Sequence, residues 1–272
     1  MSIFNKKYSV FITSTGRTAT QFLAQVLQKM IIGSISLHEP GTPWFSKPLK
    51  FLSQVGKYGL YHMTLGQFFS DHSMFKLSTE RITGKITDKK AKKNIKKMRK
   101  DMFKNIDKKI YIESSGHIFG VLDLIDDIFT YSKHVFLIRD PRYWIRSAMN
   151  TPEYILYGPL DPDFLNLSPG ANEIEDDPYH FQWPNMNKFE KYCWYYNMLN
   201  SFVLNKMSER ENFKIYRFED LFQVKNNEKN FENMLKFTCK FNDEFSHKYN
   251  FNSDLLEKKV HSNADKETKL SE

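Results

Sequence analysis

The feature that most constrains this chain is an apolar run that ends in a turn-prone loop and leads directly into a helical pattern. Tyr8 to Thr13 (YSVFIT) has the length and composition of a short buried strand. A Ser-Thr-Gly turn follows, and from Thr18 to Met30 the apolar residues recur at helical spacing. Gly33 ends the pattern, and Ser34 to Leu37 is typical of a second strand. This order predicts a parallel α/β sheet.

Three later segments have the composition of buried strands: residues 109–112 (KIYI), 134–138 (HVFLI) and 213–217 (FKIYR). Between and after them, helical periodicity predicts further helices. Their expected positions are residues 85–109, 118–128, the segment after Pro141, 187–207 and a helix that carries Phe231 to Thr238. We therefore expect one three-layer α/β domain over residues 1–272 with a central, mainly parallel five-stranded sheet.

Two stretches interrupt this alternation, at about residues 40–109 and about 151–186. The first begins with an irregular part rich in Gly and Pro, typical of loops and short helices, and the second contains several prolines and an acidic run. Loops of this length usually carry function, so we expect both regions to contribute to substrate binding. The residues from about 253 to 272 form a polar tail.

Composition narrows the function classes. No stretch approaches the ~20 consecutive apolar residues of a membrane span. The segment from Met1 also lacks the apolar core of a signal peptide, so we expect a soluble, cytoplasmic protein. Cys193 and Cys239 are far apart and belong to no CxxC, which favours reduced thiols. No His/Cys cluster has ligand spacing, so we expect no metal.

The loop after the first strand has the chemistry of an anion site. A loop that opens a helix points backbone N–H groups outward, and the helix dipole adds partial positive charge. Thr15 and Thr18 add hydroxyl donors, Gly16 permits a tight turn, and Arg17 adds a permanent charge. The alternative is an ordinary capped turn. The loop is not a kinase-type P-loop, because G-x-x-x-x-G-K-[ST] is absent.

A second candidate group follows the fourth predicted strand. Arg139 is expected at the carboxyl end of that strand, where open α/β sheets bind ligands. Ser147 lies eight residues later, about two helical turns on, so both side chains can converge on one phosphate. The alternative is a local ion pair between Arg139 and Asp140, with Ser147 incidental.

Together the two groups resemble the sulfotransferases that use 3′-phosphoadenosine 5′-phosphosulfate (PAPS). That family has a [KR]-[ST]-[GA]-T loop after its first strand, and residues 17–20 read Arg-Thr-Ala-Thr. It also has an Arg with a Ser eight residues later, as Arg139 and Ser147 are here, and a later R-[FY]-E-D-L segment, matched by residues 217–221. The resemblance runs from about residue 8 to 222. Arg17 in place of Lys points to the bacterial and carbohydrate-type branch.

The resemblance implies a P-loop-like fold and a set of donor-binding residues. These are Thr15, Gly16, Arg17, Thr18, Ala19, Thr20, Gln21, Arg139, Ser147 and Arg217. It also implies that PAPS is the donor, that PAP is the product and that no metal is required. Arg17 would lie at the oxygen bridging phosphate and sulfate, where its guanidinium stabilises charge rather than donating a proton.

A hydroxyl acceptor needs a general base. Glu39 directly follows the second strand, beside the first loop, and the resemblance favours a glutamate near this point. Its rivals are His38, His62, Glu113 and His117. The implied acceptor is a hydroxyl, less readily an amine, of a carbohydrate, glycolipid or other small metabolite, and aromatic residues of the two variable regions are candidates to line its cleft.

Two other functions remain open from the sequence. One is a P-loop nucleotide kinase or related NTPase of similar fold. The other is a non-enzymatic anion- or nucleic-acid-binding module built on Lys85 to Lys109, where twelve Lys or Arg face three acids in a chain of net charge +8. No named nucleic-acid motif is present, so we expect no nucleic acid partner. The oligomeric state is left open.

Overall fold

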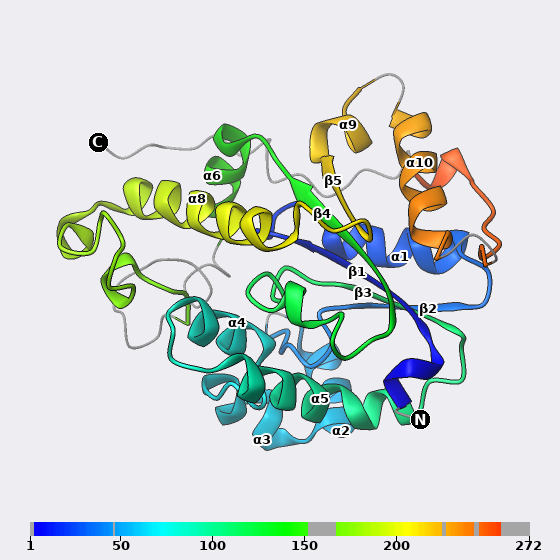
Figure 1. Ribbon diagram of the computed structural model, residues 1–272, viewed down its shortest axis with the longest axis horizontal. Helices are drawn as coiled ribbons and strands as arrows, with labels where there is room; N and C mark the ends of the chain where they lie inside the picture. The colour runs from blue at the N-terminus through cyan, green and yellow to red at the C-terminus, as the bar shows by residue number, and fades with distance from the viewer. Residues whose placement is uncertain (1–2, 46, 152–166, 225–226, 242–244, 257–272) are drawn as a thin grey trace.

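Five strands form one sheet at the centre of the molecule (Figure 1). The computed structural model describes residues 3–45, 47–151, 167–224, 227–241 and 245–256. The strands are β1 (Tyr8–Ser14), β2 (Ser34–His38), β3 (Ile110–Ser114), β4 (Tyr131–Ile138) and β5 (Phe213–Arg217). Their order is β2-β3-β1-β4-β5, and each neighbouring pair is parallel. The predicted α/β class with a five-stranded parallel sheet is confirmed.

Helices cover both faces of the sheet, because alternate strand residues point to opposite sides. Val10 and Ile12 are buried in one apolar cluster, whereas Phe11, between them, belongs to the other. The first cluster packs α1 (Thr20–Met30), α9 (Phe218–Phe222) and α10 (Asn227–Cys239) on the sheet. The second packs α4 (Met74–Ile82), α5 (Asp88–Lys104), α6 (Pro141–Met149) and α8 (Lys188–Met207). Both clusters rest on one sheet, which supports the proposal of a single domain.

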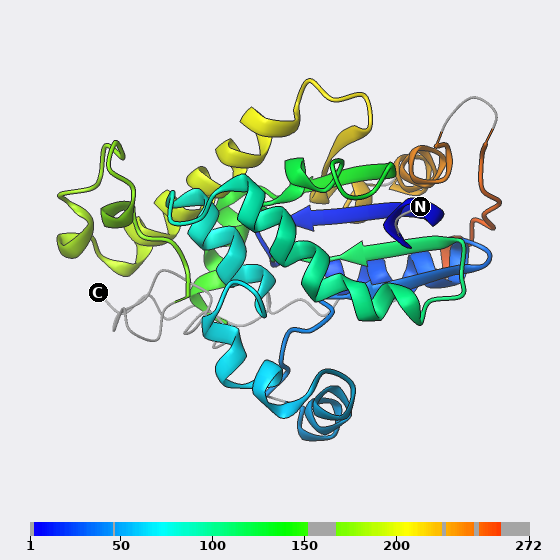
Figure 2. The ribbon, with the colours of Figure 1, turned by 60° about the horizontal axis from the view of Figure 1, so that its bottom comes forward.

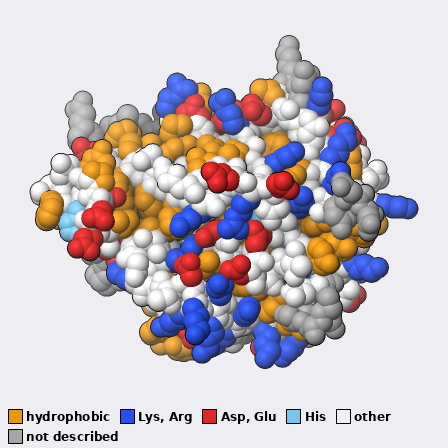
Figure 3. All heavy atoms as spheres, viewed as in Figure 1, with side chains coloured by type: hydrophobic (Ala, Val, Ile, Leu, Met, Phe, Trp, Pro, Cys, Tyr) orange, Lys and Arg blue, Asp and Glu red, His pale blue; other side chains and the backbone are white. Residues whose placement is uncertain are grey.

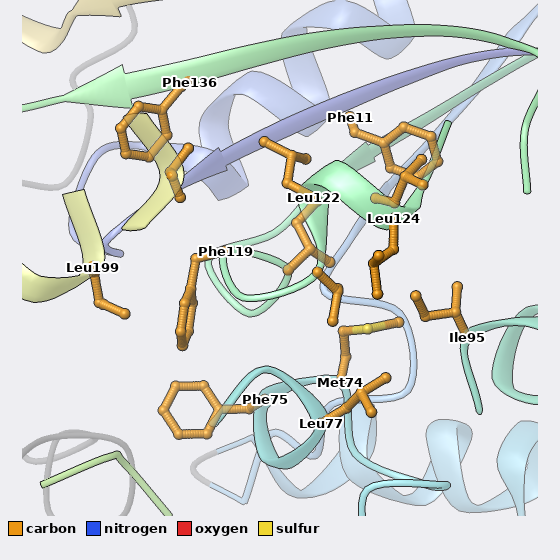
Figure 4. Packing of buried hydrophobic residues seen from close by; sticks show 14 of the residues in the cluster. Phe11, Met74, Phe75, Leu77, Ile95, Phe119, Leu122, Leu124, Phe136 and Leu199 are labelled. Atoms are coloured by element: carbon orange, nitrogen blue, oxygen red, sulfur yellow. The ribbon is translucent and has the colours of Figure 1, made fainter. Parts of the chain in front are cut away.

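The second cluster is the larger, and Figure 4 shows its centre. Phe11 and Phe136 reach it from the sheet, Met74 and Phe75 come from α4, and Leu199 comes from α8. Aromatic rings here meet at tilted or edge-on angles, as in the Phe75–Phe119 pair with ring centroids 5.8 Å apart. This packing fixes α4 and α5 in the first variable region against the sheet.

One predicted helix is wrong. Residues 118–128 form turns and a short 3-10 helix, η3 (Leu122–Leu124), although the apolar residues of the pattern are buried. A side chain at Gly120 would lie 2.5 Å from the Ser78 carbonyl oxygen, so this segment packs closely against α4. Asp123 also accepts hydrogen bonds from the Arg81 guanidinium. Tertiary contacts therefore override the helical periodicity.

The first variable region holds the expected short helices and one helix that was not expected. It holds α2 (Pro48–Tyr58), α3 (Leu60–Met63), the 3-10 helix η2 (Leu65–Phe68) and the unpredicted α4, and the basic helix α5 spans Asp88–Lys104. The second region holds the 3-10 helices η5 (Ala171–Glu173) and η6 (Trp183–Asn185), and its residues 152–166 lie outside the described part. Most of the predicted polar tail, residues 257–272, also lies outside it.

The remaining 3-10 helices lie near the two ends of the described chain: η1 (Ile3–Lys6) and η7 (Ser253–Leu255). Within the residues the structure describes, no helix is long and apolar enough to cross a bilayer.

Candidate functional site

All five strands end at the same edge of the sheet, because every pair is parallel. In Figure 2 the dark blue arrow of β1 and the green arrow of β3 point to the same side. β1 pairs with both β3 and β4, so the loop after β1 lies between the segments that follow those two strands. The candidate site is built at this edge.

The loop between β1 and α1 has an unusual backbone. Gly16, Arg17 and Ala19 have φ angles of 80°, 54° and 61°. The left-handed region is easy for glycine but costs about 1–3 kcal/mol for a residue with a side chain. Because Ala19 has left-handed backbone, the helix predicted from Thr18 begins only at Thr20. Two strained residues persist here only because contacts from other elements hold the loop.

Those contacts come from the segment that follows β4. The Trp144 indole Nε1 donates to the Gly16 carbonyl at 2.9 Å, and Arg139 Nη1 donates to the Arg17 carbonyl at 2.8 Å. In turn, Arg17 Nε donates to Ser147 Oγ at 3.1 Å. The structure therefore brings Arg17, Arg139 and Ser147 together, although 130 residues separate Arg17 from Ser147.

Arg139 is held in a largely apolar setting. Its guanidinium lies 4.7 Å from the centroid of the Phe218 ring, and Tyr196 Oη donates to its carbonyl oxygen at 2.5 Å. Burial lowers the pKa of Arg139 from its ordinary value, Glu219 opposes this, and the charge of Arg17 adds to the lowering. Nε of Arg139 is buried with no hydrogen-bond partner among the described residues. An anionic group between Arg17 and Arg139 would accept a hydrogen bond from Arg139 Nε and would oppose the lowering of the Arg139 pKa.

The other predicted donor residues surround this pair. Thr15 and Thr18 are buried, and Thr18 Oγ1 has no hydrogen-bond partner in the part of the chain described. Thr20 begins α1, and its hydroxyl lies 3.2 Å from His38 Nε2. Gln21 follows on the same helix and is partly exposed. A buried, unpaired hydroxyl at a helix start is consistent with an oxyanion ligand.

Arg217 ends β5 and is exposed. It stands opposite Ile138 in the register of β4 and β5, one residue before Arg139. Its charge helps to lower the pKa of Asp140 to about 2, although the hydrogen bond from Arg142 is the largest cause. The structure places Arg217 at the same edge as Arg139, farther from the loop than β4.

Glu39 is the centre of a second group of polar residues. It follows β2 with a φ of 45°, and Oε1 accepts a hydrogen bond from the Gly116 N–H at 3.4 Å. The Nε2 atoms of His38 and His117 each lie 3.9 Å from the same oxygen. A side chain at Gly116 would lie 3.4 Å from Gly16 Cα, so the two groups adjoin.

The groups around Glu39 oppose the effect of burial on its pKa. Burial raises the pKa of Glu39, but His117, His38, the Gly116 N–H and Lys50 lower it, and the net shift is downward. Burial lowers the pKa of His38, so its ring is neutral near pH 7. Glu39 is therefore an ionised carboxylate at neutral pH and can accept a proton.

Two of the other candidates for the general base contact residues outside the Glu39 group. Glu113 is buried and accepts hydrogen bonds from Arg99 Nε at 2.9 Å, Arg99 Nη2 at 2.5 Å and Tyr111 Oη at 2.5 Å. His62 Nε2 lies 3.0 Å from the Gly41 carbonyl, and its Nδ1 lies 3.3 Å from His72 Nδ1. His117, with Nδ1 3.1 Å from Thr42 Oγ1, and His38 remain beside Glu39.

The candidate aromatic residues divide into several groups. Trp44 lies beside the Glu39 group: its ring meets His38 edge-on at 5.3 Å, and Lys50 Nζ stands 3.5 Å from its centroid. Trp183 is buried and belongs to the core, whereas Phe181 is 90% exposed. Phe45 and Tyr61 are also exposed, Tyr58 is partly exposed, and Tyr154 and Tyr157 lie outside the described residues.

Sequence reasoning missed three supports of the site: Trp144, Tyr196 and Gly116. Trp144 and Tyr196 act through single hydrogen bonds to the loop and to Arg139, over separations of 128 and 57 residues. No local pattern signals such contacts. For Gly116, its place just after a predicted strand was an available signal.

Comparisons with known proteins give a limited picture. No family model matches the chain, and no curated protein matches it. Among solved structures, it is similar to a sulfotransferase domain from the curacin biosynthetic pathway, at 17% identity and a TM-score of 0.47, covering 88% of this chain and 76% of that one. It is also similar to shikimate kinase from Bacteroides thetaiotaomicron, at 15% identity and a TM-score of 0.37, covering 84% and 98%. Both likenesses are weak, and the fold class rests on the sheet topology above.

Proposed function

We propose that this protein transfers a sulfuryl group from PAPS to a hydroxyl of an acceptor. The observation that carries the proposal is the contact of Arg17 with Ser147 and of Arg139 with the Arg17 carbonyl. Two cationic groups and a serine hydroxyl from two separate segments thereby adjoin near the start of α1. That grip suits a nucleotide with phosphate at both its 5′ and 3′ positions, and ATP has no 3′ phosphate to fill the Arg139 side.

The donor would be bound in two halves. The backbone N–H groups of the loop, the Thr18 hydroxyl and Arg17 would hold the 5′-phosphosulfate, in keeping with the unpaired, buried Thr18 Oγ1. Arg139 and Ser147 would hold the 3′-phosphate, in keeping with the buried, unpaired Arg139 Nε. Arg217, at the same edge, would add positive charge beside it.

The reaction then needs positioning and charge stabilisation more than covalent catalysis. The acceptor oxygen forms a bond to sulfur while the bond from sulfur to the bridging phosphate oxygen breaks, and PAP leaves. Arg17 would stabilise the charge that grows on that oxygen. Glu39 would take the proton of the acceptor hydroxyl, since its lowered pKa keeps it ionised, and the adjacent neutral His38 offers a second acceptor.

A thermal-shift titration tests the donor. PAP is expected to raise the melting temperature in the absence of added metal, and ATP and GTP are expected to have little effect. Arg139→Ala should abolish the PAP shift. Arg142→Ala is the matched control, because Arg142 is exposed on the same segment and pairs only with Asp140 among the described residues. A response to ATP with magnesium but not to PAP would replace this proposal with the kinase alternative.

A further inference from the structure

A hollow of about 620 Å³ lies between α5 and the segment that leads from η2 into α4. The two helices α4 and α5 pack against each other, and α5 lies toward the viewer in Figure 1. In the same view of the surface, Lys and Arg side chains are numerous below the centre of the molecule and mix with Asp and Glu (Figure 3). None of the residues assigned to the donor or to the general base lines this hollow.

The wall contains a buried amide that has no partner. Asn94 is 6% exposed, and its Nδ2 makes no hydrogen bond to any residue that the structure describes. Buried side-chain donors are nearly always satisfied, because an unpaired one destabilises the fold. An amide kept in the wall of an open hollow therefore points to an acceptor atom supplied by a ligand.

The charges of the hollow favour an anion. Lys97 is neutralised by Asp71, with Nζ and Oδ2 2.6 Å apart. Lys90 and Lys93 also line the hollow and form no ion pair within the described part of the chain. Glu80 contributes one carboxylate. Three lysines against two carboxylates among the lining residues leave the hollow net positive.

The remaining wall favours a sugar over a small inorganic anion. Phe69 lines the hollow with a ring that is 52% exposed, and an aromatic face is a surface on which a sugar ring packs. The Asp71 and Glu80 carboxylates accept hydrogen bonds from hydroxyl groups. We infer that this hollow binds an acidic saccharide, a sugar unit that carries a carboxylate or a sulfate group. Lys90, Lys93 and Asn94 bind the acidic group, and Phe69 packs on the ring.

The hollow is linked to the Glu39 group by contacts. His72 Nε2 lies 3.8 Å from Asp71 Oδ2, and His72 Nδ1 lies 3.3 Å from His62 Nδ1. His62 in turn contacts the carbonyl of Gly41, two residues after Glu39. The hollow thus fits a second unit of an extended acidic acceptor. That role rests on the proposed function, whereas binding of the sugar does not need the donor.

Calorimetric titration tests the binding. The ligands are glucuronic acid, galacturonic acid and the 6-sulfates of glucose, galactose and N-acetylglucosamine, with glucose and inorganic sulfate for comparison. At least one acidic sugar is expected to bind about tenfold or more tightly than either comparison ligand, since charge-assisted hydrogen bonds and ring packing act together. Inorganic sulfate binding as tightly as every sulfated sugar would overturn the saccharide assignment. No binding of any acidic sugar would overturn the site.

Two pairs of lysines on α5 provide matched variants. Lys90→Gln with Lys93→Gln is expected to weaken binding about tenfold or more. Lys96→Gln with Lys100→Gln makes the same charge change on exposed positions of α5 outside the hollow, and is expected to alter binding by about twofold at most. Equal losses in both pairs would mean general attraction to a basic surface and would refute the site.

Asn94→Ala separates binding from folding. It is expected to weaken sugar binding while the melting temperature stays the same or rises, because the Nδ2 donor that it removes has no hydrogen-bond partner among the described residues. A fall in melting temperature without loss of binding would give Asn94 a purely structural role and contradict the inference. The PAP-induced thermal shift should persist in all three variants, so failure of the hollow and failure of the donor site give different results.

Discussion

Removal of the Glu113 carboxylate tests whether this residue stabilises the fold or acts as the general base. Glu113 lies one residue before the end of β3, near the edge where a general base is needed, yet it is 1% exposed and hydrogen-bonded to Arg99 and Tyr111. Burial lowers the pKa of Arg99, but the Glu113 carboxylate outweighs this and raises it. Burial and the same carboxylate raise the pKa of Tyr111.

The magnitude follows from the charge that is left behind. Glu113→Leu leaves the Arg99 guanidinium, itself 5% exposed, without its anion. Breaking a buried pair in this way costs about 3–5 kcal/mol, a large part of the roughly 5–15 kcal/mol that holds a domain folded. The triple variant Arg99→Met, Glu113→Leu, Tyr111→Phe removes the charge and both unpaired donors. It is expected to return to within about 1 kcal/mol of the parent protein.

Urea unfolding measures both steps, with an unchanged m-value as the sign that the same transition is compared. A loss below about 1 kcal/mol in Glu113→Leu would refute the argument that the pair is desolvated. The triple variant then serves for activity, because it is folded and has no carboxylate at position 113. Sulfuryl transfer is expected to persist in it. A folded triple variant without turnover would move the general base from Glu39 to Glu113.

Further outcomes are expected for four variants. Arg17→Ala should lower turnover far more than PAP affinity, measured by steady-state rates beside PAP titration; near-normal turnover would remove Arg17 from the reaction. Glu39→Gln should abolish most turnover, and in the parent protein the acidic fall of kcat/KM should lie below about pH 4.5, because the pKa of Glu39 is lowered. His117→Asn removes the neighbour that contributes most to lowering the pKa of Glu39 and should move that fall to higher pH; an unmoved limb would assign it to another group. Burial raises the pKa of Asp126, but hydrogen bonds from His134, Ser132 and Arg210 lower it well below its usual value. Its contribution to stability is present above the usual Asp pKa of about 3.9 and is lost as pH falls further, so the stability difference between the parent and Asp126→Asn should shrink below about pH 4.

Several features of the site follow from local sequence. A run of buried β-branched and aromatic residues followed by a Ser-Thr-Gly turn and a helical stripe determines β1 and α1, because each depends on contacts within a few residues. The same holds for β4, Pro141 at the start of α6, and the eight-residue spacing of Arg139 and Ser147. These patterns predicted the parallel sheet and the residues that converge at its edge.

Other features depend on partners far along the chain. Strand order puts β4 beside β1, and this alone allows Arg17 to reach Ser147. The polar groups of residues 118–128 find tertiary partners, which replaces a predicted helix with turns.

The carboxylates at the sheet edge show the same contrast between local sequence and tertiary contacts. Glu39 directly follows β2 and Glu113 lies one residue before the end of β3, so sequence places both at this edge, and the resemblance favoured Glu39. The packing of α5 on the sheet places Arg99 against Glu113, whereas the turn after β3 places Gly116 and His117 beside Glu39. Sequence determined which residues reach this edge, because strand ends are set locally. Only the tertiary structure decided which of them pairs with an arginine in the core and which lies beside two histidines, because that depends on the groups that folding brings within a few ångströms.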